Sequence, residues 1–390
     1  MGSIPADCRA AGVVAILWIA FALFDRRWRI EPRLSEPDEI WGFERVVAVV
    51  PARNEAEQLP ETLTALLAQD HPNLSIILVD DHSDDGTGAV ARRIASQAGA
   101  SDRLTVIAPP TLPSGWAGKV WAQHHGVQAA LAMKPDWIWL TDADIHHEPD
   151  VLRRLLATAM AEYRDLVSVM ARLRCETAWE RLLIPAFTYF FAAIYPFSAV
   201  GRDASRVAGA AGGCTLVRRE AMEWIGGMEA IREAVIDDVG FARACKNAGA
   251  RLWLGYHPGV QSTRRYDDLE SIWNMVARTA YTQLGHSPAA LVSCLFAMAL
   301  LFLTPVFSML FGSGWLRLLG ATTFAVMVRT YAPMVGYLGA GLGWALTLPA
   351  AATLYVGMTV SSAWRHYSGA GATWKGRAYR AGGQTLRSRD

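Results

Sequence analysis

The segment "LTDADIHH" (residues 140–147) places two carboxylates and two imidazoles directly behind an apolar run. Asp142 and Asp144 are two residues apart, so their side chains lie on the same side of an extended chain. Such a pair can give Mg²⁺ or Mn²⁺ one or two oxygens and leave the remaining coordination to water and a diphosphate. His147 could add a nitrogen ligand or contact the diphosphate, or it could be a solvated or indirectly placed histidine, and His146 has no assigned role. We therefore predict a divalent metal site at this pair of aspartates.

Two further polar clusters follow predicted strands, in "PARNE" (51–55) and "DDHSDDGT" (80–87). One strand that ends in aspartate is ordinary, because turns favour Asp and Asn. Three polar strand ends are harder to explain as turns, because ligands of open α/β sheets bind at the carboxyl ends of the strands. Asp80 and Asp81 would repel the aspartates of the third cluster, which again favours a bound divalent cation.

Two other segments carry candidate catalytic groups. In "SGWAGKVWA" (114–122), Lys119 stands where a glycine-containing loop enters a helix, a place that suits a phosphate, although an ordinary surface lysine is an alternative. In "IDDVGFA", Asp237 and Asp238 precede a predicted helix. Aspartate there can cap the helix, or it can act as a general base that takes a proton from an acceptor hydroxyl. The sequence before this pair, "GAAGGC" (209–214), is composed of small residues that allow close approach to a ligand.

These clusters must be positioned by a regular alternation of strands and helices between residues 45 and 265. Runs of β-branched residues alternate with segments whose apolar residues recur at helical spacing. Such alternation predicts a mainly parallel sheet covered by helices. We expect strands at 45–52, 75–81, 104–108 and 136–144, and helices at 55–69, 86–98 and 119–132.

The composition points to a membrane protein. Of 390 residues, 52% are hydrophobic and 19% are charged, which is apolar for a soluble enzyme. The net charge of +1 argues against a nucleic-acid partner, and nothing in the sequence indicates a protein partner. The five cysteines are scattered without metal or disulfide spacing, which is typical of a reducing compartment.

The N-terminal apolar segment, residues 10–24, is followed at once by Arg26, Arg27 and Arg29. A cleaved signal peptide carries its basic residues before the apolar run, so this order favours a signal anchor with its basic flank in the cytoplasm. The run is short, and an interfacial helix is the alternative. We assign residues 1–40 to this anchor and its flank.

The C-terminal region raises a question of topology. Residues 289–311 and 342–363 carry no charge and are long enough to cross a bilayer. The segment between them contains Arg329, which we expect near the middle of the membrane, where a charge is costly. The tail after Trp364 is basic, which favours the cytoplasm, whereas three full crossings would put it outside. We therefore expect that one C-terminal segment does not cross fully, and the sequence alone does not select it.

The motifs PARNE, VDDHSDDGT, LTDAD, GAAGGCTLVRRE and IDD, in this order, resemble those of glycosyltransferase family 2, which are inverting enzymes with a GT-A fold. The resemblance covers residues 45 to 285. It implies an α/β fold with a Rossmann-like, mainly parallel sheet that binds a nucleotide sugar, in a catalytic domain at 41–285. Membrane helices would flank this domain at both ends.

The resemblance also implies roles for single residues. In that family the first-strand segment and the aspartate that ends the second strand hold the nucleotide. Carried over to this sequence, the nucleotide-binding residues are Ala52, Arg53, Glu55 and Asp81, with Asp80 beside them.

The aspartate pair of the third motif, Asp142 and Asp144, would bind the metal and the diphosphate, and Lys119 would contact the same diphosphate. The acidic pair before the late helix would supply the catalytic base. The family usually has Glu-Asp there, whereas this chain has Asp237-Asp238, which leaves Asp238 as the base.

Within the family, the GWAGK loop and the C-terminal membrane segments resemble a lipid-glycosylating branch that includes ceramide glucosyltransferases. That branch often carries Gln/Arg-x-x-Arg-Trp. In "MVARTAYTQ" (275–283), Arg278 matches and would steady the diphosphate, but Met275 and Thr279 replace the flanking residues. The whole pattern, with "TWKGRAYR" (373–380), most resembles the bacterial hopene-associated glycosyltransferases.

The apolar stretch 179–200 lies inside the catalytic region and is flanked by Arg181 and Arg202. It is predicted to be a helix in the membrane interface beside a lipid acceptor, with a buried core helix as the alternative. We expect a C-terminal transmembrane region at 286–363 and a basic tail at 364–390.

The expected function is inverting transfer of a sugar from a nucleotide-sugar donor, with uridine diphosphate as the expected nucleotide, to a lipid hydroxyl in hopanoid or related lipid synthesis. Mg²⁺ or Mn²⁺ would be the cofactor, and membrane lipids would surround the protein. The expected place is the bacterial inner membrane, with several crossings and the catalytic domain facing the cytoplasm. The alternatives are a polysaccharide synthase of the same family and a non-catalytic membrane scaffold.

Overall fold

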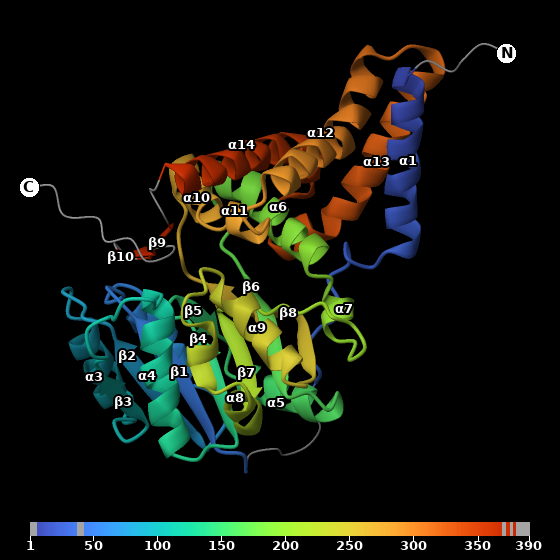
Figure 1. Cartoon of the computed structure of the whole chain (residues 1–390). Coiled ribbons are helices and arrows are strands. Elements are labelled where there is room, and N and C mark those ends of the chain that lie inside the picture. The colour runs from blue at the N-terminus through green and yellow to red at the C-terminus, as the bar shows by residue number, and fades with distance from the viewer. Residues whose placement is uncertain (1–5, 37–42, 369–371, 375–376, 380–390) are drawn as a thin grey trace, which may run out of the picture. The chain divides into compact units, whose positions relative to one another are not determined.

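The computed structural model describes residues 6–36, 43–368, 372–374 and 377–379 (Figure 1). The chain forms two compact units. One, here called the sheet unit, contains Pro32–Leu173 and Tyr195–Arg264, and groups with them the short strands β9 (Ala372–Trp374) and β10 (Arg377–Tyr379). The other, here called the helical unit, contains the N-terminal helix, residues 174–194 and the segment from Arg265 onward. Residues 174–194 and 265–285, which we expected in the catalytic domain, therefore group with the helices of the N- and C-terminal regions.

The sheet unit is built on one eight-stranded sheet, in the order β3-β2-β1-β4-β7-β6-β8-β5. Four pairings are parallel and three are antiparallel, so the expected mainly parallel sheet is confirmed. All seven residues of β1 and all five of β4 are buried, as expected of strands that are covered on both faces. The strands are β1 (Val46–Ala52), β2 (Leu74–Asp80), β3 (Leu104–Ile107), β4 (Trp137–Thr141), β5 (Ile145–His147), β6 (Leu166–Arg172), β7 (Cys214–Arg218) and β8 (Leu252–Ser262).

Helices cover the sheet at the predicted places, but one helix begins later and one strand ends earlier than predicted. The helix expected at 55–69 begins only at Leu59, because the amides of Asn54 and Ala56 donate to the loop after β2 and leave the helical path. The strand expected at 136–144 ends at Thr141, so both aspartates of the TDAD segment lie beyond it. The helices are α2 (Leu59–Leu67), α3 (Thr87–Gln97), α4 (Gly118–Ala132), α5 (Val151–Ala161), α7 (Phe197–Val200), α8 (Arg219–Trp224), η1 (Gly227–Ile231) and α9 (Asp237–Asn247).

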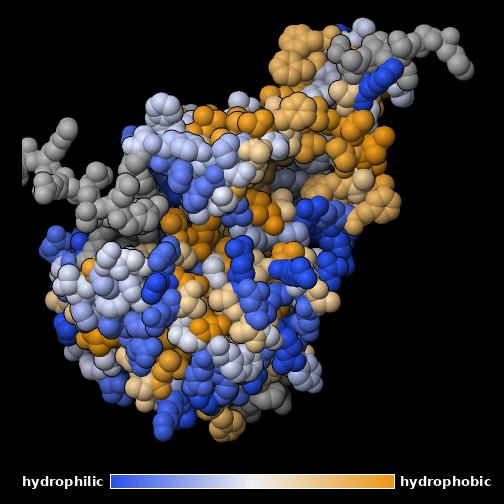
Figure 2. Space-filling model, in the orientation of Figure 1, coloured by the Kyte–Doolittle hydropathy of each residue, from blue (hydrophilic) through white to orange (hydrophobic). Residues whose placement is uncertain are grey.

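The helical unit is strongly apolar. Among the described residues, four segments are long and apolar enough to span a membrane, at residues 178–200, 288–311, 314–337 and 342–367, and the first of them extends from the helical unit into the sheet unit at Tyr195. A shorter apolar helix lies at Cys8–Phe24. Figure 2 shows apolar side chains over the region of α1, α12 and α13, where Ile16, Phe296 and Trp315 are at least 68% exposed. The helices are α1 (Ala6–Phe24), α6 (Ala178–Ile194), α10 (Leu269–Ala277), α11 (Ala280–Gln283), α12 (Pro288–Phe311), α13 (Gly314–Tyr337), η2 (Leu342–Thr347) and α14 (Leu348–Tyr367).

The apolar stretch 179–200 is not one helix. α6 ends at Ile194, since the residue before a proline is disfavoured in the helical conformation and Pro196 follows. Inside the helical unit, α6 is central: the Tyr189 hydroxyl lies 3.2 Å from the Thr330 hydroxyl, and the Tyr355 hydroxyl donates to the Leu183 carbonyl at 3.0 Å.

The first turn of α6 is fixed by a fully buried carboxylate, that of Glu180. The amides of Glu176 and Thr177 donate to it at 2.8 and 2.9 Å, and the Thr177 hydroxyl accepts from the Glu180 amide, which makes a capping box. The amide of Tyr266 donates to the second carboxylate oxygen at 2.9 Å and ties the segment after β8 to α6.

We expect Glu180→Gln to lower the free energy of unfolding by about 1–3 kcal/mol, because an amide NH₂ would face backbone donors that lose their acceptor. A thermal melt of the detergent-solubilised chain measures this as a drop in Tm. Glu176→Gln is the matched control, since that side chain is largely exposed. Equal Tm values for the two variants would contradict the role given to the capping box.

Candidate active site

The loops that follow β1 and β2 are joined by hydrogen bonds at the carboxyl edge of the sheet. The amide of Asn54 donates to the Ser83 hydroxyl at 3.0 Å, and the amide of Asp84 donates back to the Asn54 side chain at 3.1 Å. Asn54 and His82 both adopt φ of 53°, in the left-handed region. The pairing holds the residues that follow the two strands in one surface.

The structure brings together the residues predicted to hold the nucleotide. The Arg53 guanidinium donates to the backbone carbonyl of Asp81, and the amide of Glu55 donates to the Thr87 hydroxyl at 3.0 Å. Ala52 and Asp81 are fully buried, and the amide of Asp81 donates to the Ala52 carbonyl at 2.8 Å. Contact of Ala52 and Asp81 with a nucleotide therefore stays a prediction.

Asp80 has a role within its own loop. Its two carboxylate oxygens accept from the amides of Ser83 and Gly88, each at 3.1 Å. A Cβ atom on Gly88 would lie 2.6 Å from the same carboxylate, so only glycine allows this approach. Asp80 thus fixes the turn that leads into α3.

Lys119 forms the centre of the charged site. Its ammonium lies 2.8 Å from the Asp142 carboxylate and 3.2 Å from that of Asp237, and its side chain is only 15% exposed. Burial disfavours the ammonium charge, but the carboxylates of Asp142, Asp237 and Asp238 outweigh burial and raise the pKa of Lys119. We had expected a divalent metal to offset the repulsion among Asp80, Asp81, Asp142 and Asp144, and in the structure Lys119 compensates part of the charge at Asp142.

The aspartates of the TDAD segment lie just beyond β4. Burial raises the pKa of Asp142, Lys119 opposes this shift, and Asp144 and Asp237 add to it. The Asp144 carboxylate lies 3.9 Å from the Arg264 guanidinium. The two carboxylates are hard oxygen donors of the kind that Mg²⁺ and Mn²⁺ prefer. Within the described ranges, no group of three or more His, Cys, Asp or Glu side chains could hold a metal ion. The donor set therefore fits a metal that takes its remaining ligands from a diphosphate and water.

His147 does not belong with these carboxylates. β5 alternates between buried and partly buried residues, and His147 faces inward, where it is 1% exposed. Its Nε2 lies 2.8 Å from the Thr141 hydroxyl, and its ring packs 4.6 Å from the ring of Trp139. Burial lowers the pKa of His147 to about 3, so the imidazole is neutral near pH 7. We therefore do not retain His147 as a metal ligand. His146 is directed toward the surface, 3.9 Å from the Glu61 carboxylate.

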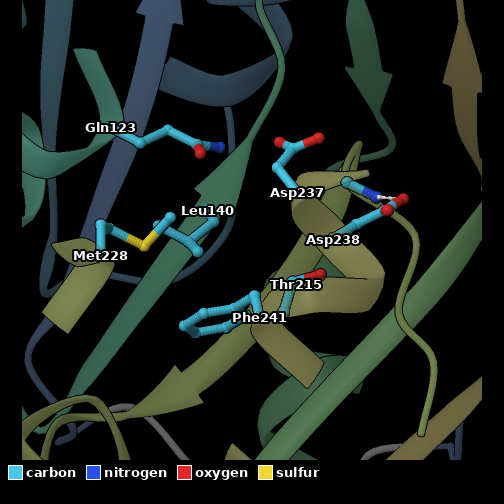
Figure 3. Close-up of a pocket in the computed structure, with 8 residues that line it drawn as sticks. Gln123, Leu140, Thr215, Met228, Asp237, Asp238 and Phe241 are labelled. Atoms are coloured by element: carbon cyan, nitrogen blue, oxygen red, sulfur yellow. Dashed lines mark hydrogen bonds between the residues drawn. The ribbon is translucent and has the colours of Figure 1, made fainter. Parts of the chain in front are cut away.

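The acidic pair opens α9, and its two side chains have different partners. Asp237 pairs with Lys119, whereas the Asp238 carboxylate accepts from the amide of Gly212 at 3.1 Å and from its own neighbour Val239 at 2.7 Å. In Figure 3 the two carboxylates point apart, and the dashed line marks the bond to the Gly212 amide. Asp238 lies in the first turn of α9 and also borders a pocket. The N-cap residue of α9 is Ile236 and no side chain caps the helix, so the capping interpretation of this pair is not supported.

The pocket in Figure 3 joins elements that are distant in the sequence. Burial, and then the negative charge of Asp237, raise the pKa of Asp238 to about 6, although Lys119 opposes them. A carboxyl group in this range can accept a proton near neutral pH. The lining residues are Gln123, Leu140, Gly212, Thr215, Met228, Asp237, Asp238 and Phe241.

Two residues of this site have roles that sequence reasoning missed. A Cβ atom on Gly212 would lie 3.3 Å from the Lys119 ammonium and 3.6 Å from Asp238 Cβ, so a glycine lets the loop come between them. The loop is held by Ser168, a buried serine in β6 whose hydroxyl accepts from the Ala211 amide at 2.8 Å. A lone serine in the apolar run LVSVMA was the available signal for this anchor.

Arg278 belongs to the helical unit, where it is the C-cap residue of α10. Its contact with a diphosphate stays a prediction.

Residues 44–282 match the family model described as "Glycosyltransferase like family 2". An undecaprenyl-phosphate 4-deoxy-4-formamido-L-arabinose transferase from Aeromonas hydrophila is 31% identical over 140 residues, which is 35% of this chain and 39% of that protein. A polyprenol monophosphomannose synthase from Mycolicibacterium smegmatis is 31% identical over 126 residues, 31% of this chain and 43% of that protein. The chain thus spans well under half the length of either relative.

A solved structure has a similar fold over almost the whole chain. It is a mannosyltransferase from Pyrobaculum calidifontis in complex with GDP-Man and Mn²⁺. The TM-score is 0.54 and the identity is 21%, over 94% of this chain and 96% of that one. This likeness supports the α/β assignment together with the accompanying helices.

Proposed function

Because the chain belongs to the glycosyltransferase-like family 2, we propose that it moves a sugar from a nucleotide-sugar donor to a lipid acceptor, with inversion at the anomeric carbon. The observation that carries the proposal is the double contact of Lys119. It joins Asp142, the first aspartate after β4, to Asp237, which lies beside the candidate base in the sequence. A residue proposed to act at the sugar donor and one beside the proposed base for the acceptor, 95 positions apart in the sequence (142 and 237), thereby lie next to the same lysine.

Each group has a proposed task. Asp142 and Asp144 would hold Mg²⁺ or Mn²⁺, which when bound neutralises charge on the leaving diphosphate. Arg53, Glu55 and Asp81 would contact the nucleotide, with uridine diphosphate as the proposed nucleotide. The structural relative was solved with Mn²⁺, which agrees with the proposed cofactor.

Asp238 is the proposed base. It takes the proton of the acceptor hydroxyl as that oxygen forms a bond to the anomeric carbon. The bond between that carbon and the diphosphate breaks, and the nucleoside diphosphate leaves with the electron pair. Lys119 stabilises the carboxylates around this centre, and Arg278 would steady the diphosphate.

The proposed acceptor is the hydroxyl of a hopanoid or a related lipid, and the proposed place is the bacterial inner membrane with the sheet unit in the cytoplasm. The two relatives named above suggest a second candidate, a polyprenyl phosphate. A phosphate acceptor already carries a negative oxygen and does not need a base, whereas a hydroxyl does. The partly buried carboxylate of Asp238, with its raised pKa, favours the hydroxyl.

The proposal is tested by incubating the purified full-length chain with nucleotide sugars and Mn²⁺, with and without extracted bacterial lipids. Release of nucleoside diphosphate should rise when lipid is added. Release that never depends on lipid would contradict a lipid acceptor, and no release from any donor would favour a non-catalytic scaffold.

The pH dependence follows from the raised pKa of Asp238, about 6. The base must be deprotonated, so kcat/KM should be constant above this value and fall about tenfold per pH unit below it. An ordinary aspartate, with a pKa of about 3.9, would keep the rate constant to roughly pH 4.5. A rate profile from pH 4.5 to 8 at saturating Mn²⁺ measures the difference.

A further inference from the structure

We infer that, of the described helices, α1, α12 and α13 cross the bilayer, whereas α6 and α14 lie in the plane of its surface and contact lipid from one side. The C-terminal tail then returns to the side of the membrane that holds the sheet unit. This selects α14 as the C-terminal segment that does not cross, although its length and composition would allow it to. The inference does not rest on the proposed function.

The chain on both sides of α6 requires its two ends to be on one side of the membrane. β6 ends at Arg172 and α6 begins at Ala178. Directly after α6, the Tyr195 Cβ atom lies 3.2 Å from the Cβ position of Gly209, and the Phe197 ring stacks on Tyr256 at 4.6 Å, both within the sheet unit.

A helix that crosses the bilayer separates its ends by a hydrocarbon layer of about 30 Å. The chain enters the sheet unit at the residue after α6, so no linker is left to return across such a distance. α6 must therefore lie along the membrane surface on the side of the sheet unit.

α14 packs along α6. The Tyr355 hydroxyl donates to the Leu183 carbonyl at 3.0 Å, and the Tyr355 ring lies 5.2 Å from that of Phe190. Figure 1 shows α14 running across the direction of α1 and α13 rather than beside them, within the same unit.

The last turns of α14 pack against α10 and α11. The Ser362 hydroxyl accepts from the Tyr281 amide at 2.9 Å, and the Arg365 guanidinium donates to the Asn274 side chain at 2.7 Å. α10 begins at Leu269, soon after β8 ends at Ser262, so it also lies on the side of the sheet unit. α14 therefore contacts elements of that side from Tyr355 to its end.

The outer face of α14 suits lipid. Near its C-terminal end, Val360, Trp364 and Tyr367 are exposed at intervals of four and three residues, which is one face of a helix. Trp and Tyr at its end are the residues that favour the boundary between membrane and water. In η2, which precedes α14, Leu342 and Leu346 are also exposed.

The three crossing helices pack on one another. The Trp18 indole of α1 donates to the Leu301 carbonyl of α12 at 2.9 Å, and its ring meets Phe302 at 5.6 Å. In α13, Gly320 lies so close to the backbone of Ser308 and Met309 that a Cβ atom would clash. Small residues allow such close approach between membrane helices.

Arg329 agrees with this arrangement. Its guanidinium lies 5.7 Å from the centre of the Trp28 ring, in the basic flank that follows α1. The next residue, Thr330, contacts Tyr189 of α6. The inference therefore places Arg329 at the level of the membrane surface, in place of the position near mid-membrane that we expected from the sequence.

The sidedness of the tail tests the inference on the full-length chain. The background carries Cys8→Ser and Cys294→Ala, because the remaining cysteines are buried. Ser313→Cys, between α12 and α13, is compared with Ser101→Cys in the sheet unit and with a cysteine tag after Asp390. Each is labelled in intact cells with a membrane-impermeant maleimide.

We expect Ser313→Cys to react in intact cells, and Ser101→Cys and the tag to react only after permeabilisation. A tag on the same side as Ser101→Cys and opposite Ser313→Cys supports the inference in either orientation. A tag that reacts together with Ser313→Cys, or three sites on one side, overturns it.

A second measurement separates an in-plane helix from a spanning one. Nitroxide labels at positions 346, 353, 360 and 364 should all lie at one shallow depth, roughly 5–10 Å into the headgroup boundary. Labels at 292, 296, 299 and 307 on α12 are the control and should be deepest near the middle of the helix. An α14 series with the same deep centre would refute the inference.

Discussion

Asp238→Asn is expected to lower kcat for sugar transfer to a hydroxyl by about 10²- to 10⁴-fold, the usual contribution of a positioned general base. Donor affinity should change less than about twofold, because Asp238 faces the acceptor proton in the proposed mechanism and the nucleotide contacts lie on other loops. Asparagine has nearly the same shape as aspartate and keeps one side-chain oxygen, so the bond from the Gly212 amide can be kept. Product formation and donor binding by calorimetry measure the two effects.

Asp237→Asn is the matched control, because Asp237 is the neighbouring aspartate but pairs with Lys119 rather than with the Gly212 amide. It removes the negative charge that raises the pKa of Asp238. The base is retained, so activity should persist and the acid limb of the pH profile should move to lower pH. An unchanged kcat in Asp238→Asn with a hydroxyl acceptor would refute the base assignment. An unchanged kcat with a polyprenyl phosphate alone would favour the second candidate acceptor.

Asp142→Asn is expected to reduce metal-dependent transfer by about 100-fold or more, since a catalytic metal is worth several kcal/mol of transition-state stabilisation. The substitution removes one of the two proposed metal ligands and also a partner of Lys119. The half-saturating concentration of Mn²⁺ should rise together with the loss of rate. A titration of activity with Mn²⁺ after treatment with EDTA measures both.

Asp102→Asn, at an exposed position between α3 and β3, is the control for loss of a charge in the sheet unit. It should keep the wild-type dependence on Mn²⁺. Full activity of the wild type in EDTA, or an unchanged Mn²⁺ titration in Asp142→Asn, would contradict the metal assignment.

The fold was predictable where one local signal sufficed. β1 and β4 are continuous apolar runs, and such runs are typical of strands covered on both faces, so their positions were recognised within a few residues. The order of polar strand ends was also visible, because these ends follow the strands directly. The start of α2 at Leu59, rather than at residue 55, was not predicted, because its cause is a pair of hydrogen bonds to the neighbouring loop.

The residue types of the candidate site could be predicted from the sequence, but the contacts between these residues could not. Lys119 was expected at a phosphate, and its two carboxylate partners lie 23 and 118 positions away (142 and 237), beyond any local pattern. The sequence left the role of His147 open, because the direction of a residue in a three-residue strand depends on pairing with β8, which the sequence does not display. The division into two units could not be predicted either, because it depends on contacts between residues far apart in the sequence. The bond from the Tyr266 amide to Glu180, for example, spans 86 positions.

The most direct test of the proposed function is transfer of radiolabelled sugar into organic-extractable lipid. The full-length chain in nanodiscs made from bacterial lipid extract would be given labelled nucleotide sugars and Mn²⁺. We expect a labelled lipid that depends on Mn²⁺, disappears in Asp238→Asn and resists mild acid, as a glycoside of a hydroxyl does. Labelled lipid that forms equally well in Asp238→Asn and is released by mild acid, as a glycosyl phosphate is, would contradict it.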